Sequence, residues 1–376
     1  MPEYTYRFAD LLTDADVVEL ELSDVKFDRR INQAGAFSAT AVVSNSEVAE
    51  QVKKVVPAKT IVHVYRDSEI WGSYIIWTMN ISSSSHGPVK VDFQGASLES
   101  WLEKRIIDTD LTFTGVDQFD IARALIDNAQ LGWTPYETAS HLGIEYNLDD
   151  SGILRDRSYY LTDAASVGQR LRELANVDNG FEFMINTYED NGIRHRIFLI
   201  YSQMGYEEND VIFTYPGNIN SYELTYDATS SATAWWTRGD TIDDDITATS
   251  APLMTPIPSL SDLWLSNGYP HLDRVVDYTS VTLLTTLEDY AAWWRDNHSG
   301  FIAIPVITIS TNSLNTIITP TTLGSYADFT IEDEFFSLGE FSSRNRIIGI
   351  EVSPPQRGRQ ESIRLVIETA IDPTDI

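Results

Sequence analysis

Cysteine is absent from this chain of 376 residues. The absence excludes disulfide bonds, iron–sulfur clusters, thiol catalysis and zinc sites that use cysteine ligands. The composition, 43% hydrophobic and 11% aromatic, is that of a globular protein, and the length allows about two to four domains. We therefore expect stability to come from core packing or from assembly with other chains.

Long apolar runs are also missing. The longest, FIAIPVITI at residues 301–309, contains Pro305 and is about half of the roughly 18 residues that a membrane span needs. The N-terminal stretch MPEYTYRFADLL has acidic residues where a secretory signal has lysine or arginine. We expect a protein without a membrane span that is synthesised in a cytoplasm.

Positive charge is scarce, because 26 lysines and arginines stand against 56 acids and leave a net charge of -30. Such a chain repels phosphate backbones and anionic membranes. One interpretation is solubility alone. The other is that acids coat a surface along which DNA passes without sticking, and the sequence leaves both open.

Motifs of enzymes and cofactor sites are missing as well. There is no GxSxG, Walker loop, GxGxxG or HExxH, and the histidines are scattered. Three groups of acids could in principle supply a carboxylate pair or hold Ca²⁺, but they lie in expected turns without EF-hand spacing. These groups are Asp149 with Asp150, Asp243 with Asp244 and Asp245, and Glu332 with Asp333 and Glu334. We predict no catalytic, cofactor-binding or metal-ligating residues, and no enzyme.

Aromatic and basic pairs suggest packing more than binding. Trp235 with Trp236 and Trp293 with Trp294 could stack on sugars. Neighbours in a strand point to opposite faces, so one of Trp235 and Trp236 is expected inside its barrel and the other against an adjacent domain or subunit. Trp293 and Trp294 lie on an expected helix, where one of the two is expected to face the core. Six arginines come as spaced pairs, for which we expect ion pairing with the surplus acids or contact with a neighbouring subunit. They are Arg155, Arg157, Arg344, Arg346, Arg357 and Arg359.

The hydrophobic periodicity predicts a mainly β protein with α+β insertions. Residues 1–103 alternate apolar and polar side chains between turns, which is typical of an antiparallel β-barrel. Residues 104–210 combine helical spacing with a hairpin at EDNG and predict an α+β peripheral domain. Residues 240–301 predict a helical and loop insert, with Thr286 and Asp289 at capping-box spacing.

An internal repeat is the main architectural prediction. The stretch FSATAVVSN at 37–45 returns as SSATAWWTRG at 230–239, and both are followed by an acid-ended strand, an Ile-Ile strand, a long polar hairpin and a closing strand. We therefore expect a second, split β-barrel at 211–239 and 302–376. Three chains with two barrels each can make a ring of six nearly equivalent units.

Several segments together resemble a known family. They include IWGSYIIWTMNIS from 70, SLESWLEKRIIDTDLTFTGVDQFDIARALIDNAQ from 97, and RNRIIGIEVSPPQRGRQESIRLVIE from 344. These stretches are similar to minor tail proteins of long-tailed (siphovirus) actinobacteriophages, the baseplate hub or tail-tip hub family. The resemblance covers nearly the whole chain and contains no catalytic motif.

What the resemblance implies is a homotrimeric hub at the tail tip of the virion. Such a hub continues or closes the tail tube, joins the hexameric distal tail protein to tip or fibre proteins, and contacts the tape-measure protein. DNA passes through its channel at ejection without specific binding. Two alternatives stay open: a tail-borne carbohydrate-binding or cell-wall-hydrolysing module, and the hub of a bacterial contractile injection system.

Overall fold

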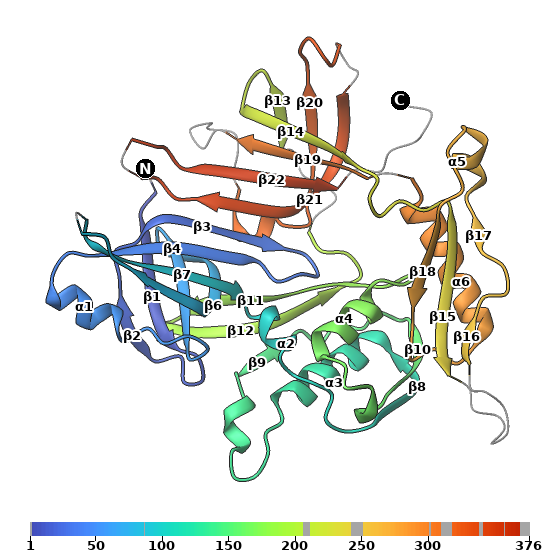
Figure 1. Ribbon diagram of the computed structural model, residues 1–376, viewed down its shortest axis with the longest axis horizontal. Coiled ribbons are helices and arrows are strands. Elements are labelled where there is room, and N and C mark those ends of the chain that lie inside the picture. Colours follow the sequence, from blue (N-terminus) through green and yellow to red (C-terminus); the bar gives the residue numbers. More distant parts are fainter. Residues whose placement is uncertain are drawn as a thin grey trace.

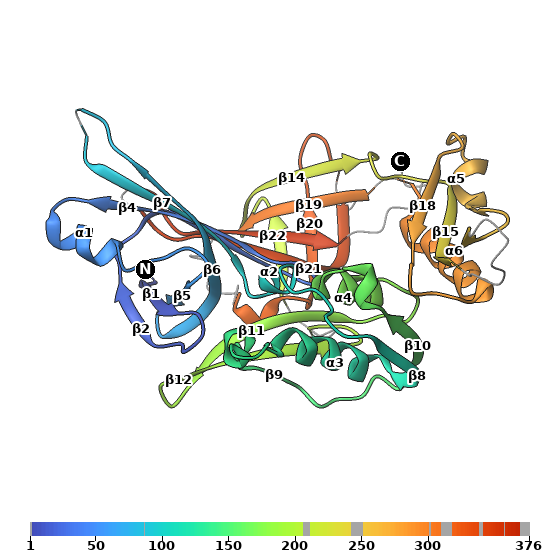
Figure 2. The same ribbon diagram turned by 60° about the horizontal axis from the view of Figure 1, so that its bottom comes forward.

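The computed structural model describes residues 2–85, 87–205, 211–241, 251–300, 302–309, 318–337, 341–356 and 358–368. It confirms a mainly β fold with few helices, built around one 13-stranded sheet and three smaller sheets. Figures 1 and 2 show four parts: a blue unit, a red and orange unit beside it, a green domain, and a gold insert. No helix in the described ranges is both long and apolar enough to cross a bilayer.

The first sheet unit contains seven strands and one short helix. Their order across the sheet is β3-β4-β7-β6-β5-β1-β2, with every neighbouring pair antiparallel. Large apolar side chains such as Phe8, Phe93 and Tyr74 fill its interior. The elements are β1 Tyr4–Asp10, β2 Asp16–Glu19, β3 Ser23–Arg30, β4 Ala36–Val43, α1 Ser46–Val52, β5 Thr60–Arg66, β6 Glu69–Ser82 and β7 Val89–Ser97.

The second sheet unit repeats five of these strands in the same spatial order. Its path is β14-β19-β22-β21-β20, all antiparallel, which matches β3-β4-β7-β6-β5 strand for strand. The sixth strand differs, because β13 runs parallel to β20 whereas β1 runs antiparallel to β5. The elements are β13 Ile212–Tyr215, β14 Ile219–Asp227, β19 Ile302–Ile309, η3 Pro320–Thr322, β20 Tyr326–Ile331, β21 Phe341–Ser353 and β22 Ser362–Glu368.

Local details of the two units agree as well. In β6 the register against β7 shifts at Trp77, and in β21 the register against β22 shifts at Ile348, one residue after an Ile in both cases. Each of those isoleucines, Ile76 and Ile347, accepts a backbone hydrogen bond of 2.7 Å. The donors are Ala58 and Gly324, both with positive φ. Bulges and turns at matching positions indicate that the two units are repeats of one structural unit.

The repeat differs from the sequence prediction in one strand. Residues 234–241 form β15, whose partners among the described strands all belong to the small gold sheet, so the second SATA segment is not the counterpart of the first. The strand in the place of β4 is β19. Among the described strands, moreover, no ladder closes either unit into the expected barrel, and the pairing follows an open path.

The peripheral domain follows the first sheet unit and packs helices on short sheets. Its α3 and α4 pack together in a core that also contains Ile61 and Ile75 from the outer face of the first unit. Ser166 caps α4 by accepting a hydrogen bond from the backbone of Gln169. The elements are α2 Glu99–Leu102, β8 Leu111–Asp117, α3 Gln118–Gln130, η1 Glu137–Ser140, β9 Ile144–Tyr146, β10 Leu154–Tyr159, η2 Leu161–Asp163, α4 Val167–Ala175, β11 Glu182–Asp190 and β12 Ile193–Tyr201.

The insert lies between β14 and β19, where the first unit has the short turn between β3 and β4. Its long helix begins after Leu283, so Thr286 does not form the predicted capping box, although Gly300 follows its end with φ of 77°. The elements are β15 Ala234–Thr241, β16 Pro252–Met254, β17 Ser259–Leu260, α5 Asp262–Ser266, β18 Asp273–Asp277 and α6 Leu284–His298.

Candidate assembly surfaces

The two sheet units are joined edge to edge by β21 and β3. Gly349 to Val352 pair antiparallel with Arg30 to Phe27, so the second unit continues the sheet of the first. Phe27 is 3% exposed and Val352 is 2% exposed, and both belong to the core that the two units share. Backbone hydrogen bonds and apolar cross-strand pairs thus hold this internal joint.

Ion pairs run across the opposite face of the joint. Glu351 on β21 accepts from Arg30 on β3 and from Arg364 on β22, and Arg364 also reaches Glu223 on β14 at 3.4 Å. Arg30 further contacts Asp28 at 3.0 Å. This face therefore carries alternating charges of both signs, and the surplus acids do not gather here.

A buried arginine connects the second sheet unit to the peripheral domain. Arg346 on β21 donates two hydrogen bonds of 2.7 Å to Glu182 on β11. It also donates to the carbonyl oxygens of Gly324 and Met204. The Arg346 side chain is 8% exposed and that of Glu182 is 18% exposed. A bidentate pair of this kind fixes two parts of the chain in one orientation.

A second bidentate pair connects the two sheet units. Arg66 at the end of β5 donates to Glu361, just before β22, at 2.7 and 3.0 Å. Tyr4 donates its hydroxyl to the same carboxylate, whose side chain is 2% exposed. The guanidinium of Arg66 lies 4.6 Å from the ring centre of Trp71. The Glu361 carboxylate is thus buried with its hydrogen bonds made, and the Trp71 ring lies against the Arg66 guanidinium.

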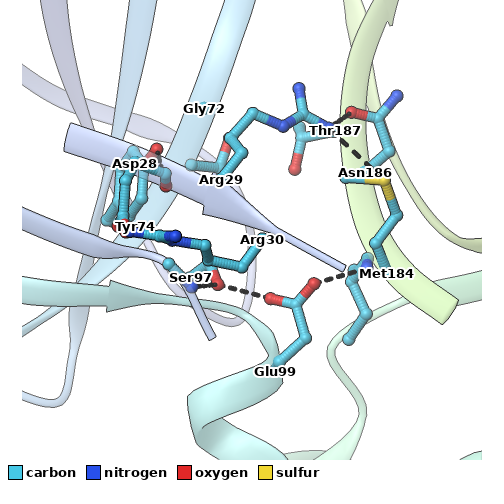
Figure 3. Close-up of a pocket in the computed structure, with 13 residues that line it drawn as sticks. Asp28, Arg29, Arg30, Gly72, Tyr74, Ser97, Glu99, Met184, Asn186 and Thr187 are labelled. Carbon is cyan, nitrogen blue, oxygen red and sulfur yellow. Dashed lines mark hydrogen bonds and ion pairs between the residues drawn. The ribbon is translucent and has the colours of Figure 1, made fainter. Parts of the chain in front are cut away.

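Polar groups also fill the space between the first sheet unit and β11. Figure 3 shows Glu99 between Ser97 and the strand that carries Met184; the carboxylate accepts from the Ser97 hydroxyl and from the backbone of Ile185. Burial raises the pKa of Glu99, although these two hydrogen bonds favour its charged form. The cavity beside it holds about 20 Å³, which is room for about one water molecule. This junction is a structural contact and not a ligand pocket.

His63 lies at the centre of another buried polar cluster. Its Nδ1 is 2.8 Å from the Ser73 hydroxyl and its Nε2 is 3.1 Å from Asp14. Asp14 also accepts from Arg194 at 2.7 Å and from Arg196 at 2.8 Å, which ties the first sheet unit to β12. Burial lowers the pKa of His63, outweighing the Asp14 contact that raises it. Burial opposes ionisation of Asp14, but its contacts with His63 and the two arginines depress the Asp14 pKa.

This cluster predicts a loss of stability in mild acid. A histidine held neutral in the fold ionises near pH 6.5 in the unfolded chain, so the unfolded state binds the extra proton and the free energy of unfolding falls below that pH. We expect His63→Gln to flatten the fall of the thermal midpoint between pH 7.5 and 5.5. Thermal unfolding of both proteins across this range checks it. The exposed His271→Gln is the control, and parallel curves for wild type and His63→Gln would contradict the prediction.

The acidic groups that lie within the described residues serve in turns and loops. Asp333 accepts from the backbone of Phe335 and Phe336 and from the hydroxyl of Tyr222, so it serves as a turn residue. Asp149 lies in a loop, and its backbone carbonyl accepts a hydrogen bond from Arg123. Residues 243–245 lie outside the described residues. In the described part of the chain, no group of three or more metal-ligating side chains is found.

The tryptophan pairs behave as packing residues. Trp235 is 1% exposed and stacks on Trp294 with ring centres 5.1 Å apart. Trp236 points the other way, half-buried, and donates to Asp273. The prediction that one neighbour of this pair is buried is confirmed, but it packs within the insert and not inside a barrel, because β15 belongs to the small sheet. Trp293 lies edge-on against Trp294.

The arginine pairs are only partly ion-paired. Arg344 and Arg346 contact Asp328 and Glu182, as expected. Arg155 instead donates to the carbonyl oxygens of Asp178 and Asn179. Arg157 donates to the Tyr290 hydroxyl, which links β10 to the insert. Arg359 pairs its backbone with Gln356, and Arg357 lies outside the described residues.

Sequence reasoning missed the residues of the internal joint. Arg30, Glu351 and Arg364 had no shared motif to connect them, since β3 and β21 are separated by more than 300 positions of the chain. The Arg66 and Glu361 pair was missed for the same reason. A usable signal was one charged residue in each of two apolar stretches, Glu351 in IIGIEVS and Arg364 in SIRLVI, which face each other across β21 and β22.

Solved structures of tail proteins share this fold. The tail protein from Neisseria meningitidis MC58 has a TM-score of 0.59 at 12% identity, over 98% of this chain and 98% of that one. The 43 kDa tail protein of prophage MuSo2 from Shewanella oneidensis gives 0.60 at 10% identity over 99% of both chains. A chain of the half-lidded Francisella PdpA-VgrG complex gives 0.51 at 10% identity, over 100% of this chain and 59% of that one.

These likenesses establish the fold and nothing further, because the identities are only 10–12%. No family model matches the chain, and no curated protein matches it by sequence. The expectation of a tail-protein fold is confirmed. The narrower resemblance to tail-tip hubs of long-tailed actinobacteriophages stays a prediction.

Proposed function

We propose that this chain is a structural component of a bacteriophage tail tip, the homotrimeric baseplate hub. The observation that carries the proposal is the repeated five-strand order together with the joint between β21 and β3. That joint brings unlike edges of two similar units together, and such a head-to-tail contact generates a ring when its rotation closes. Two units per chain and three chains give six positions around the axis.

The proposed partners follow from that symmetry. A ring of six similar units matches the hexameric distal tail protein on one side, while tip or fibre proteins attach on the other. The tape-measure protein contacts the ring, and DNA leaves through its channel without specific binding. If the charged face of the joint lines the channel, the wall is hydrophilic and of mixed sign. The expectation of a uniformly acidic wall is not supported there.

The mass in solution tests the proposal directly. We expect the full chain of 42.3 kDa to form a species of three copies, because two unfinished sheet edges per copy favour pairing with further copies. Light scattering coupled to size exclusion over a range of concentrations measures this mass. A chain that stays monomeric at every concentration, and also in assembled tails, contradicts the ring.

A tail-borne carbohydrate-binding or wall-hydrolysing module is the alternative, and the described residues give it little support. Two features of the sequence suggested this alternative, the acidic groups and the tryptophan pairs. Asp333 is engaged as a turn residue, and Trp235 is buried in the insert. We therefore propose a protein without catalytic activity. The shared fold with a chain of the PdpA-VgrG complex leaves an injection-system hub as a related proposal.

A further inference from the structure

Two strands of the large sheet have an edge that no other described strand covers. Beyond Ile76, β6 runs on to Ser82 but pairs only with β7 among the described strands. The second strand, β14, is a terminal strand of the path and pairs with β19. Ile81 on the first edge is 64% exposed, and Tyr226 on the second is 52% exposed. Residues 78–82 contain no charge and no proline, the devices with which proteins usually protect an edge.

These edges are the counterparts of the two strands that already pair inside the chain. By the shared strand order, β6 occupies the place of β21, and β14 occupies the place of β3. The bulges align Trp77 with Ile348, so residues 78–81 correspond to residues 349–352. On the other strand, Phe27 pairs with Phe37 as Leu224 pairs with Pro305, so residues 224–227 correspond to residues 27–30.

We propose that β6 of one copy pairs antiparallel with β14 of the next copy, with residues 78–81 beside residues 227–224 and Asn80 opposite Thr225. This pairing repeats between chains the joint that β21 and β3 make within one chain. It rests on the proposed function in taking the assembly to be a closed ring of three. Each copy then contributes one internal joint and one joint with its neighbour.

The side chains match this register. On the face that continues into the shared core, Met79 meets Tyr226 and Ile81 meets Leu224; Met79 and Leu224 already pack against that core. Apolar cross-strand pairs of this kind stabilise a sheet. The opposite face is polar on both strands: Thr78, Asn80, Thr225 and Asp227. The internal joint shows the same division, with Phe27 and Val352 buried and the ion pairs on the other face. A slip by one residue would put apolar against polar side chains.

Pairs of introduced cysteines test the register of the proposed strand pairing. The natural chain has no cysteine, so no other disulfide can form. The backbone N–H of Ile31 donates to the Ile348 carbonyl, which makes Asp28 and Glu351 a non-hydrogen-bonded pair with close side chains. Its counterpart between copies is Asn80 with Thr225. We expect Asn80→Cys/Thr225→Cys, after oxidation, to shift on a non-reducing gel from one chain to three linked chains.

Two controls fix the interpretation. Asp28→Cys/Glu351→Cys is expected to close within one chain, which shows that the geometry permits a disulfide. Asn80→Cys/Ser221→Cys moves one partner four residues along β14, about 13 Å away, and is expected to stay unlinked. If the linked species contains a number of copies other than three, the edge pairing stands and the trimer of the proposed function is wrong.

Failure of the inference is distinguishable from failure of the proposed function. A trimer by light scattering that gives no Asn80–Thr225 link, while the intrachain control closes, overturns the pairing and leaves the hub. A persistent monomer overturns both. Ile81→Asp gives an independent measurement, since Ile81 is 64% exposed and its replacement spares the monomer's core. We expect it to abolish the trimer, whereas Ile193→Asp, at a site 63% exposed on the peripheral domain, retains it. Equal masses for these two variants would contradict the pairing.

Discussion

Replacing Arg346 by methionine is expected to lower the free energy of unfolding by about 3–5 kcal/mol, because the change leaves the largely buried Glu182 carboxylate without its charged partner. Arg346 donates both hydrogen bonds to Glu182 and also binds the carbonyl oxygens of Gly324 and Met204. Methionine fills similar volume but satisfies none of these acceptors. Thermal or denaturant unfolding of the full chain measures the loss, reported as a shift of the midpoint since several domains are present.

The matched control lies two residues earlier on the same strand. Arg344 pairs with Asp328 in an ion pair whose two side chains are 42% and 45% exposed. Exposed pairs of this kind contribute about 0–1 kcal/mol, so Arg344→Met is expected to shift the midpoint little. Equal shifts for the two variants would mean that the Arg346 contact with the peripheral domain is not the one that matters.

Replacing Trp235 by alanine is expected to loosen the insert by about 3–5 kcal/mol, the usual cost of deleting a large buried aromatic. Trp235 stacks on Trp294 and donates its indole N–H to Ser299 at 3.1 Å. Because β15 pairs only within the small sheet, we expect faster proteolysis within the insert while the large sheet stays intact. Limited proteolysis with mass analysis of the fragments checks this.

The neighbouring residue separates packing from sugar binding. Trp236 is half-buried and faces away from the core of the insert. If these tryptophans pack the insert, Trp236→Ala changes stability much less than Trp235→Ala. If they form a carbohydrate-stacking face, Trp236→Ala instead reduces sedimentation of the protein with host cell wall and leaves proteolysis unchanged. The second outcome would favour the carbohydrate-binding alternative over the structural proposal.

Periodicity in the sequence predicted most of the local structure. Helical spacing at residues 118–130 and alternation along β4 report burial directly, since each side chain's exposure depends on its own face. The hairpin turn at Asn191 and Gly192 was predictable, because the Asn-Gly pair favours a two-residue turn with positive φ. Both residues adopt positive φ in the structure. The start of α6 was predicted less well, because Leu283 precedes the helix and Thr286 lies inside it.

Long-range pairing was the part that periodicity could not supply. The repeated SATA letters suggested that β15 matches β4, but strand identity is decided by hydrogen-bonded neighbours and not by four side chains. The true counterpart, β19, contains Pro305 and has no such string. The joint of β21 with β3 is made largely by backbone groups, which every residue carries, so composition gives no sign of it. Consequently the duplication was predictable, but the way in which the copies meet was not.

The polypeptide that connects the two sheet units changes how assembly depends on protein concentration. Because β21 and β3 meet within one polypeptide, their encounter is governed by an effective concentration and not by the amount of protein in solution. In the proposed ring of three chains, three of the six joints are therefore made within single chains, and assembly requires encounters of three chains instead of six separate units. Complementary edges at both ends of each chain also allow a different outcome. If the rotation between successive chains does not close a ring, further chains add and an open filament grows.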